Sequence, residues 1–250
     1  MSARPAISAH WGVRGHRPPA SMETYENALA TGAEYVEFDI RRLADGTLVC
    51  FHDGRVGHTG PPLATLSYER FCGLVGFAVP TVPDVMALLA GRARAHLDLK
   101  EIGYEAEVVR LAVAALGADG FVATTLEDES IAAIAREFPN VRTALSLGRD
   151  NREIPRRKLP AVRISELLPL RRARACGAHW VAVNYRIAGP VLRQCARHGV
   201  GAMVWTVDED RLIDRYLRDD RVDVLITNRP GYALHRRASL AAPRSEDAAE

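Results

Sequence analysis

Short runs rich in β-branched and aromatic residues alternate along the chain with segments in which apolar residues recur at helical spacing. The helical spacing is present in residues 105–117, 128–138 and 209–219. Strands that alternate with helices in this way indicate a parallel sheet built from crossover units. The expected strands are residues 6–12, 35–42, 94–100, 121–126, 142–148, 179–185, 201–207 and 222–228.

Eight strand–helix units within 250 residues predict the fold class. A closed (β/α)8 barrel, the TIM barrel, usually has about this length. We therefore expect a single α/β domain over residues 1–238, followed by a small polar tail, residues 239–250, that is disordered. A doubly wound open sheet is the structural alternative, but no GxGxxG motif follows the first expected strand.

Three stretches depart from the alternation. Residues 48–53 form a further extended segment, which we expect to pair with the second strand through the turn Ala44-Asp45-Gly46. Residues 54–80 are rich in glycine and proline and predict a loop insertion with one short helix near 67–74. Residues 149–160 are rich in arginine and proline and predict a second loop.

The overall charge gives little support for a charged macromolecular partner. Lys and Arg total 33 and Asp and Glu total 31, and a net charge of +2 is too small to indicate binding to nucleic acid or to a membrane. The most basic stretch, residues 149–174, has nine Lys and Arg against three acids. We expect it to be a solvated face, with attraction of an anionic substrate as the second interpretation. Because the sequence has neither a signal peptide pattern nor a membrane-spanning apolar run, a cytoplasmic protein is the default expectation.

Two carboxylates lie two residues apart in the second expected strand. Glu37 and Asp39 therefore face the same way, and Val36, Phe38 and Ile40 form the other face. Since helices cover the outside of a barrel, we expect the carboxylates to point inward, near its C-terminal mouth. Adjacent carboxylates repel each other unless a cation lies between them, and their oxygens suit Mg²⁺ or Ca²⁺. Contact with solvent or with an arginine is the alternative.

The next expected barrel strand repeats the spacing with an acid and a base. Asp98 could complete the metal site, and Lys100 could bind a phosphate oxygen. A buried ion pair between the two side chains is an equal alternative when these residues are considered alone. Their position at the end of a barrel strand favours the functional interpretation.

Two histidines each end an extended segment: His10 ends the first strand, and His52 ends the segment 48–53. Histidine titrates near neutrality, so such a pair can deliver one proton and remove another. Phosphodiester cleavage needs both transfers and a cation that stabilises the developing charge. A lone histidine is more often structural than catalytic. Asp53 could orient a neighbouring group or cap the following turn, and we favour the cap.

Trp205 is expected near the mouth, where it could line a substrate pocket. A core aromatic residue is an equally good interpretation of its position.

Several of these segments, in this order and spacing, resemble the glycerophosphodiester phosphodiesterase family. The resemblance covers residues 6–235. Its motifs are His10-Trp11-Gly12, Gly15-His16-Arg17-Pro18, Gly32-Ala33, Val36-Glu37-Phe38-Asp39-Ile40, Asp45-Gly46, His52-Asp53, Pro80-Thr81-Val82-Pro83-Asp84-Val85, Leu97-Asp98-Leu99-Lys100, Val204-Trp205-Thr206-Val207 and Ile226-Thr227-Asn228-Arg229-Pro230.

The resemblance implies a (β/α)8 barrel with one divalent cation, Mg²⁺ or Ca²⁺. It implies metal ligation by Glu37, Asp39 and Asp98, and phosphate contact by Lys100. It implies catalysis by His10 and His52, without assigning which is the acid and which the base. The implied reaction converts a glycerophosphodiester and water to an alcohol and glycerol 3-phosphate.

Some positions depart from the family pattern and suggest an altered substrate pocket. Trp11 stands where the family usually has arginine, and Pro19-Ala20 stands where it usually has Glu-Asn. Arg14 or Arg17 could replace the lost phosphate contact, whereas Trp11 offers a flat apolar surface for a bulkier group.

The pair formed by Asp98 and Lys100 also resembles the spider-venom phospholipase D enzymes, which release a cyclic phosphate. Three hypotheses follow: a phosphodiester hydrolase, which we favour, a cyclising phosphodiester lyase, and a barrel that binds or transforms another phosphorylated ligand. The expected partner is a small-molecule phosphodiester, with no nucleic acid and no stable membrane insertion.

Overall fold

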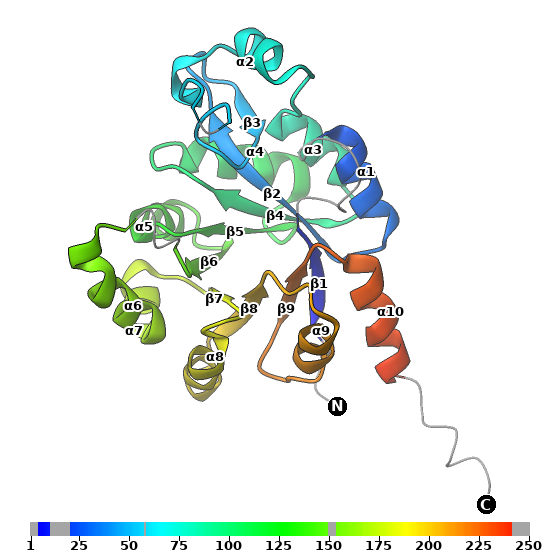
Figure 1. Cartoon of the computed structure of the whole chain (residues 1–250), viewed down its shortest axis with the longest axis vertical. Coiled ribbons are helices and arrows are strands. Elements are labelled where there is room, and N and C mark those ends of the chain that lie inside the picture. The colour runs from blue at the N-terminus through cyan, green and yellow to red at the C-terminus, as the bar shows by residue number, and fades with distance from the viewer. Residues whose placement is uncertain (1–4, 11–20, 58, 150–153, 242–250) are drawn as a thin grey trace, which may run out of the picture.

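Parallel strands form a closed barrel surrounded by helices in the computed structural model of the chain (Figure 1). The structure describes residues 5–10, 21–57, 59–149 and 154–241. The barrel strands are β1 (Ala6–Ala9), β2 (Tyr35–Arg42), β4 (Arg94–Leu99), β5 (Phe121–Thr125), β6 (Arg142–Leu147), β7 (Trp180–Asn184), β8 (Gly201–Trp205) and β9 (Val224–Thr227). Neighbours in this order pair in parallel, and β9 pairs with β1 to close the ring. The predicted (β/α)8 barrel is confirmed.

Helices cover the outside of the barrel (Figure 1). The segments with helical spacing correspond to α4 (Glu105–Leu116), α5 (Asp128–Glu137) and α9 (Asp210–Leu217), which confirms those three predictions. The helices in the described ranges around the barrel are α1 (Met22–Ala30), α3 (Val82–Leu89), α4 (Glu105–Leu116), α5 (Asp128–Glu137), α6 (Leu159–Leu167), α7 (Leu170–Cys176), α8 (Ala188–Arg197), α9 (Asp210–Leu217) and α10 (Pro230–Ala241), with a 3-10 helix, η3 (Arg156–Lys158), before α6.

The alternation along β2 sorts its side chains between two cores. Val36, Phe38 and Ile40 are fully buried against the helices, in the main hydrophobic core. Tyr35 points to the other side and joins the core inside the barrel. Glu37 and Asp39 lie on the same side of the strand as Tyr35 and therefore point inward, as predicted. The core inside the barrel consists of Tyr35, Val122, Ala144, Ala182, Met203, Val224 and Ile226.

The chain leaves the barrel between β2 and α3 to form a small projection with its own core, at the top of Figure 1. β3 (Leu48–Cys50) pairs antiparallel with β2, as predicted, and Gly46 turns the hairpin with a φ of 87°. The predicted loop insertion contains η1 (Leu63–Thr65) and α2 (Tyr68–Val75), close to the short helix predicted near 67–74. The core of this projection consists of Leu43, Val49, Leu63, Leu66, Phe71 and Val79.

Polar side chains begin the helices of this region. Ser67 accepts a hydrogen bond from the backbone N–H of Arg70 at the start of α2. Thr81 does the same for Asp84 at the start of α3. Because the first backbone N–H groups of a helix have no partner within the helix, these hydroxyls fix where each helix begins.

Two predicted segments differ from the structure in part. The predicted loop 149–160 contains η3 and the first turn of α6, and its residues 150–153 lie outside the described residues. Pro160 occupies the first turn of α6, where a proline is tolerated because no backbone N–H is needed there. The predicted tail, residues 239–250, begins inside α10, which extends to Ala241. Residues 242–250 lie outside the described residues.

A helix long and apolar enough to span a bilayer does not occur in the described ranges.

Candidate active site

A cavity of about 780 Å³ opens at the C-terminal ends of the barrel strands. This is the end at which TIM barrels carry their active sites. Six predicted site residues line it: His10, Glu37, His52, Asp98, Lys100 and Trp205. Asp39, a seventh, lies in the same carboxylate cluster as Glu37 and Asp98. Trp11 and the Pro19-Ala20 pair lie outside the described residues.

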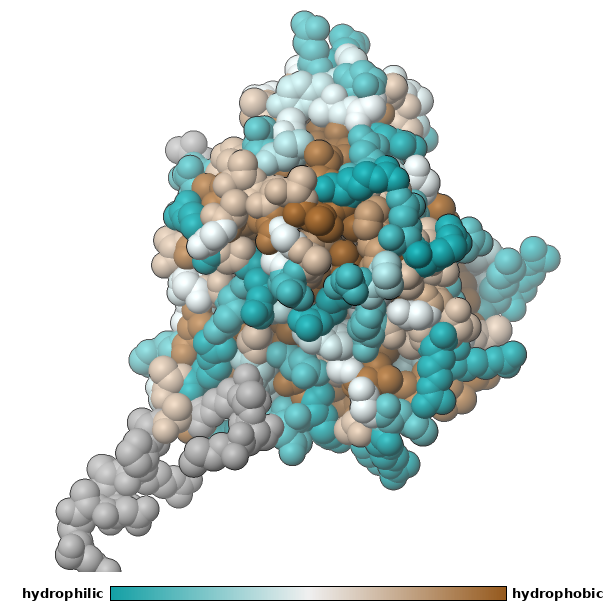
Figure 2. Space-filling view, turned by 180° about the vertical axis from the view of Figure 1, so that it is seen from behind, coloured by the Kyte–Doolittle hydropathy of each residue, from teal (hydrophilic) through white to brown (hydrophobic). Residues whose placement is uncertain are grey.

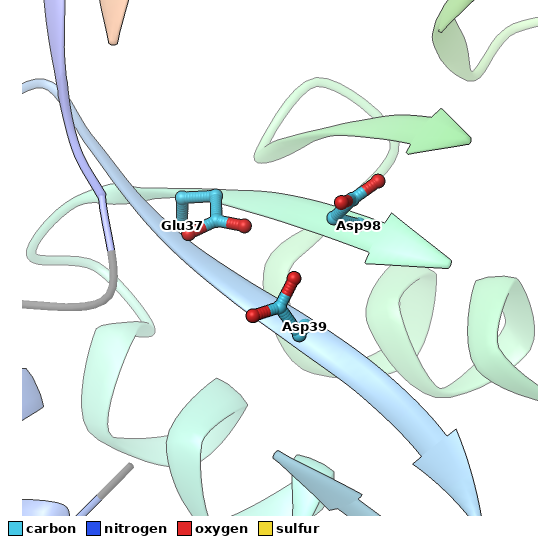
Figure 3. A group of neighbouring side chains, drawn as sticks. All are labelled: Glu37, Asp39 and Asp98. Carbon is cyan, nitrogen blue, oxygen red and sulfur yellow. The ribbon is translucent and has the colours of Figure 1, made fainter. Parts of the chain in front are cut away.

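Three carboxylates from two adjacent strands converge in this cavity (Figure 3). Glu37 and Asp39 project from β2, and Asp98 projects from β4, where its Cα is the register partner of Asp39. One oxygen from each residue lies within 4.8 Å of the others. Glu37 is only 3% exposed and Asp39 only 5%. Backbone register therefore holds the acids together on the inner face of the barrel.

Lys100 supplies a positive charge to this cluster. Its Nζ lies 2.8 Å from Asp39 Oδ1 and also forms an ion pair with Asp98. Burial lowers the pKa of Lys100, but the carboxylates of Asp98 and Asp39 outweigh burial and raise it well above its ordinary value. Burial likewise raises the pKa of Asp98, and Lys100 outweighs this effect and holds that pKa below its ordinary value. Lys100 is therefore charged, and one ammonium faces three acids.

The donor set fits a divalent cation. Asp39 Oδ1 is buried, and a contact it makes among the described residues is the ion pair with Lys100 Nζ, 2.8 Å away. One ammonium leaves the three acids with a net negative charge in a largely buried site, which is costly unless a further cation is bound. Carboxylate oxygens are the ligands that Mg²⁺ and Ca²⁺ prefer. Glu37, Asp39 and Asp98 could therefore hold one such ion.

His10 is oriented by a chain of two polar residues. Asn228 Nδ2 donates to Asp208 Oδ2 at 2.7 Å, and the Asn228 backbone N–H donates to Asp208 Oδ1 at 2.8 Å. Asn228 Oδ1 therefore faces His10 Nδ1, 2.9 Å away, and this nitrogen must be the donor. Burial lowers the pKa of His10, and the hydrogen bond to Asn228 offsets this only in part. The neutral imidazole consequently keeps its lone pair on Nε2.

His52 occupies a more open position, after β3. Its Nδ1 lies 2.8 Å from Asp53 Oδ1, so Asp53 orients the histidine, which is the less favoured of its two predicted roles. Arg41 donates to the backbone carbonyl of His52 at 2.9 and 3.1 Å and pairs with Glu101 at 2.9 Å. These contacts connect the projection around β3 to the barrel strands β2 and β4.

A third histidine, His96, lies beneath the carboxylates and was not predicted from the sequence. Its Nδ1 lies 3.1 Å from Ser8 Oγ and its Nε2 lies 3.0 Å from Thr124 Oγ1. Thr124 also donates to Asp98 Oδ1 at 3.0 Å. Burial lowers the pKa of His96 to about 4. The spacing of two residues between His96 and Asp98 is the one sequence signal that could have placed both on the same face.

Arginines from the predicted basic stretch reach the opposite side of the cavity. Arg149 and Arg163 line it, in line with the second interpretation of that stretch, and Arg186 from the loop after β7 lines it too. Glu166, which is buried, accepts hydrogen bonds from the backbone N–H groups of Gly148 and Arg149 at 2.9 and 3.0 Å. It also pairs with Arg163. This glutamate therefore fixes both the loop that presents Arg149 and the side chain of Arg163 on α6.

Trp205, at the end of β8, both lines the cavity and packs beside the core inside the barrel. Its Nε1 donates to the carbonyl of Ala182 at 3.1 Å. The two interpretations of this residue are therefore compatible. Gly148 passes close to it, since a Cβ on Gly148 would lie 3.4 Å from the Trp205 ring and 2.7 Å from Asn184 Cβ. Its φ of 111° also favours glycine.

Comparison with protein families gives a match across most of the chain. The model described as "Glycerophosphoryl diester phosphodiesterase family" matches residues 10–232. A Mycobacterium tuberculosis protein described as probable glycerophosphodiester phosphodiesterase 1 is 41% identical over 59 residues. That alignment spans 24% of this chain and 22% of the relative, well under two thirds of its length.

Solved structures with the same fold cover almost the whole chain. A glycerophosphodiester phosphodiesterase from Parabacteroides distasonis has a TM-score of 0.76 and 20% identity, over 97% of this chain and 100% of that one. A phosphodiesterase from Oleispira antarctica, in complex with the product sn-glycerol-3-phosphate, has a TM-score of 0.70 and 15% identity. That match covers 93% of this chain and 96% of the other. At these identities the likeness shows a shared barrel fold.

Acidification should destabilise the folded chain through His96. Because burial holds its pKa at about 4, the folded state keeps this imidazole neutral between pH 6.5 and 4. The unfolded chain takes up a proton below its ordinary pKa of 6.5. The unfolded state then binds more protons, so the free energy of unfolding falls as the pH falls, by about 3 kcal/mol at pH 4.

Denaturant titrations of the wild type and of His96→Gln across this pH range isolate the contribution of His96 from that of the carboxylates. The stability of the wild type relative to the variant should decrease as the pH falls. A difference that stays constant from pH 6.5 to 4 would show that His96 is not held neutral.

Proposed function

Since the chain belongs to the glycerophosphoryl diester phosphodiesterase family, we propose that it hydrolyses a glycerophosphodiester to an alcohol and glycerol 3-phosphate with the help of one divalent cation. The observation that supports this most directly is the convergence of Glu37, Asp39 and Asp98 in one cavity with His10 and His52. Metal ligands and proton-transfer groups are what phosphodiester hydrolysis requires together.

The three carboxylates are the proposed metal ligands, and Mg²⁺ or Ca²⁺ is the proposed ion. When bound, the ion would neutralise phosphate oxygens and stabilise the charge that develops on them. Lys100 binds a further phosphate oxygen through its ammonium group. Its present contacts with Asp39 and Asp98 keep it charged and hold it on the metal side of the cavity.

His10 and His52 are the proposed acid–base pair. One accepts a proton from the attacking water as the oxygen–phosphorus bond forms. The other donates a proton to the leaving oxygen as its bond to phosphorus breaks, so the protons balance over the step. His10 is held by Asn228 with the lone pair of its neutral form on Nε2, and Asp53 holds His52.

The part of the substrate beyond the phosphate is proposed to differ from that of typical family members. In the sequence, Trp11 stands at the position of a family arginine, and Trp205 provides an aromatic surface in the cavity. Arg149, Arg163 and Arg186 provide cations on the β6–β7 side, where they could contact an oxygen-rich substrate arm. A small-molecule phosphodiester is the proposed substrate class.

Attack by a hydroxyl of the substrate in place of water is the second candidate reaction. The acid-x-lysine pair of Asp98 and Lys100 favours it to the extent that it resembles the cyclising phospholipase D enzymes. The product would then be a cyclic phosphate, whose phosphorus resonance is separate from that of a phosphomonoester. Phosphorus NMR of the products of a phosphodiester panel therefore decides between the two reactions.

Asp39→Asn should weaken the binding of Mg²⁺ or Ca²⁺ by about tenfold or more, because it removes one anionic oxygen donor from the cluster. Isothermal titration calorimetry of the metal-free protein measures this directly, and addition of EDTA should abolish diesterase turnover. Glu129→Gln, on the exposed start of α5, is the matched control. Turnover that persists in EDTA would exclude the metal-assisted reaction.

His10→Ala and His52→Ala should each lower kcat by about 100-fold or more, because each removes one of the two proton transfers. Steady-state kinetics on the best diester of the panel give the measurement. His235→Ala, at an exposed position of α10, should behave like the wild type. A near-normal rate in either site variant would remove that histidine from the proposed pair.

Trp11→Arg should raise kcat/KM for a simple glycerophosphodiester by about tenfold, if Trp11 is what disfavours small substrates. A tenfold gain corresponds to about 1.4 kcal/mol, which is the size expected for a regained arginine–phosphate contact. The comparison uses one small and one bulky diester with both proteins. Equal preference in the wild type and the variant would show that the pocket differs elsewhere.

A further inference from the structure

Helix α6 has an inverted arrangement of polar and apolar side chains. Its one fully buried residue is Glu166, which is 2% exposed. Ile164 within the helix and Leu168 just after it are each 59% exposed, and Leu167 is 37% exposed. A surface helix usually directs its apolar stripe toward the core. Here the apolar face is directed to solvent, and an ion pair between the buried Glu166 and the partly exposed Arg163 anchors the opposite face.

The exposed charges within residues 156–171 are of one sign, although Glu127, Asp128 and Glu129 at the start of α5 face α6 from the side of Val162 and Ser165. Arg156, Arg157 and Lys158 form η3 immediately before α6, and all three are exposed. Arg171, in the first turn of α7, is exposed as well. The one acid between residues 154 and 171 is the buried Glu166. This segment, 156–171, therefore forms a basic and apolar face, and its solvent-facing charge is entirely positive.

This basic and apolar face adjoins the mouth of the cavity. Glu166 holds the loop after β6, and Arg163 from α6 itself lines the cavity. Gln194 on α8 donates to the carbonyl of Leu167 at 2.7 Å and fixes the C-terminal end of α6. In Figure 2 the α6 side of the barrel forms the right-hand edge, and hydrophilic side chains project furthest there.

We propose that the basic and apolar face, residues 156–171, docks on the surface of a membrane that contains anionic lipids. Anionic headgroups would contact the cations of η3, and Ile164 and Leu168 would enter the boundary with the acyl chains. α6, at nine residues, lies in the plane of that surface without crossing it. This docking does not depend on the reaction that the cavity performs.

A membrane fits these observations better than a protein partner or nucleic acid. Two copies of this face would repel each other through their positive charges. Nucleic acid offers negative charge but no apolar layer for exposed Ile164 and Leu168. An anionic bilayer surface offers both, and exposed apolar residues beside lysine and arginine are the usual composition of a segment that lies in such an interface.

Vesicle co-sedimentation of the full chain tests the proposal. The wild type should bind vesicles of phosphatidylcholine with about a third phosphatidylglycerol, and should bind phosphatidylcholine alone at least tenfold more weakly. The triple variant Arg156→Gln, Arg157→Gln, Lys158→Gln should lose on the order of 100-fold in partitioning. The double variant Ile164→Ser, Leu168→Ser should lose about tenfold.

Matched controls remove exposed positive charges at the other end of the barrel and an exposed apolar side chain on the projection. Arg136→Gln, Arg197→Gln, Arg218→Gln removes three exposed arginines at the ends of α5, α8 and α9, and Leu74→Ser removes a 41% exposed leucine on α2. Both should bind like the wild type. Circular dichroism melting should show that every variant is folded.

Three results would overturn the proposal. The first is a wild type that does not bind anionic vesicles. The second is a triple or double variant, folded by circular dichroism, that binds them as the wild type does. The third is a concentration-dependent dimer in the absence of vesicles that the Ile164→Ser, Leu168→Ser variant abolishes, which would assign the face to a second copy of the chain.

Discussion

Electrostatic repulsion among three carboxylates, two of them buried and one partly exposed, is the constraint around which the site is organised. Asp39 and Asp98 are register partners on adjacent strands, so the backbone holds their side chains together whatever their charge. Two unit charges about 4 Å apart in a partly buried site interact by several kcal/mol, which is large against the net stability of a domain. Lys100 offsets part of this repulsion and Thr124 donates one hydrogen bond to Asp98. Three acids against one ammonium leave a net negative charge, and this charge makes the cluster suited to a cation.

The part of the site that could be predicted from the sequence is the part that depends on strand periodicity. Glu37 and Asp39 could be placed on one face because side chains alternate along a strand, and the apolar residues between them identified the other face. The partners of His10 and His96 could not be found in this way. Asn228 is 218 residues from His10, and Ser8 is 88 residues from His96. Such contacts depend on which strands become neighbours and in what register.

Closure of the barrel is what creates the support for His10. β9 pairs with β1, so Asn228, just after the last strand, meets His10, just after the first. Asp208, which follows β8 by a few residues, then fixes the amide of Asn228 from the other side. Helix α6 was missed for a different reason. Its apolar residues face solvent and its core-facing residue is a glutamate, so the pattern that usually identifies a surface helix is reversed.

The two histidines of the proposed reaction differ in a way that suits a cycle with two proton transfers. His10 is partly buried and held by a network that extends across the barrel seam, so its ring orientation is fixed. His52 lies on the projection around β3, half exposed, beside an exposed Asp53. An acid–base pair has to return to its starting protonation state after each turnover, which requires exchange with solvent. His10, which is fixed, sets the geometry of proton transfer, and His52, which is open, exchanges its proton with water. The insertion between β2 and α3 supplies His52.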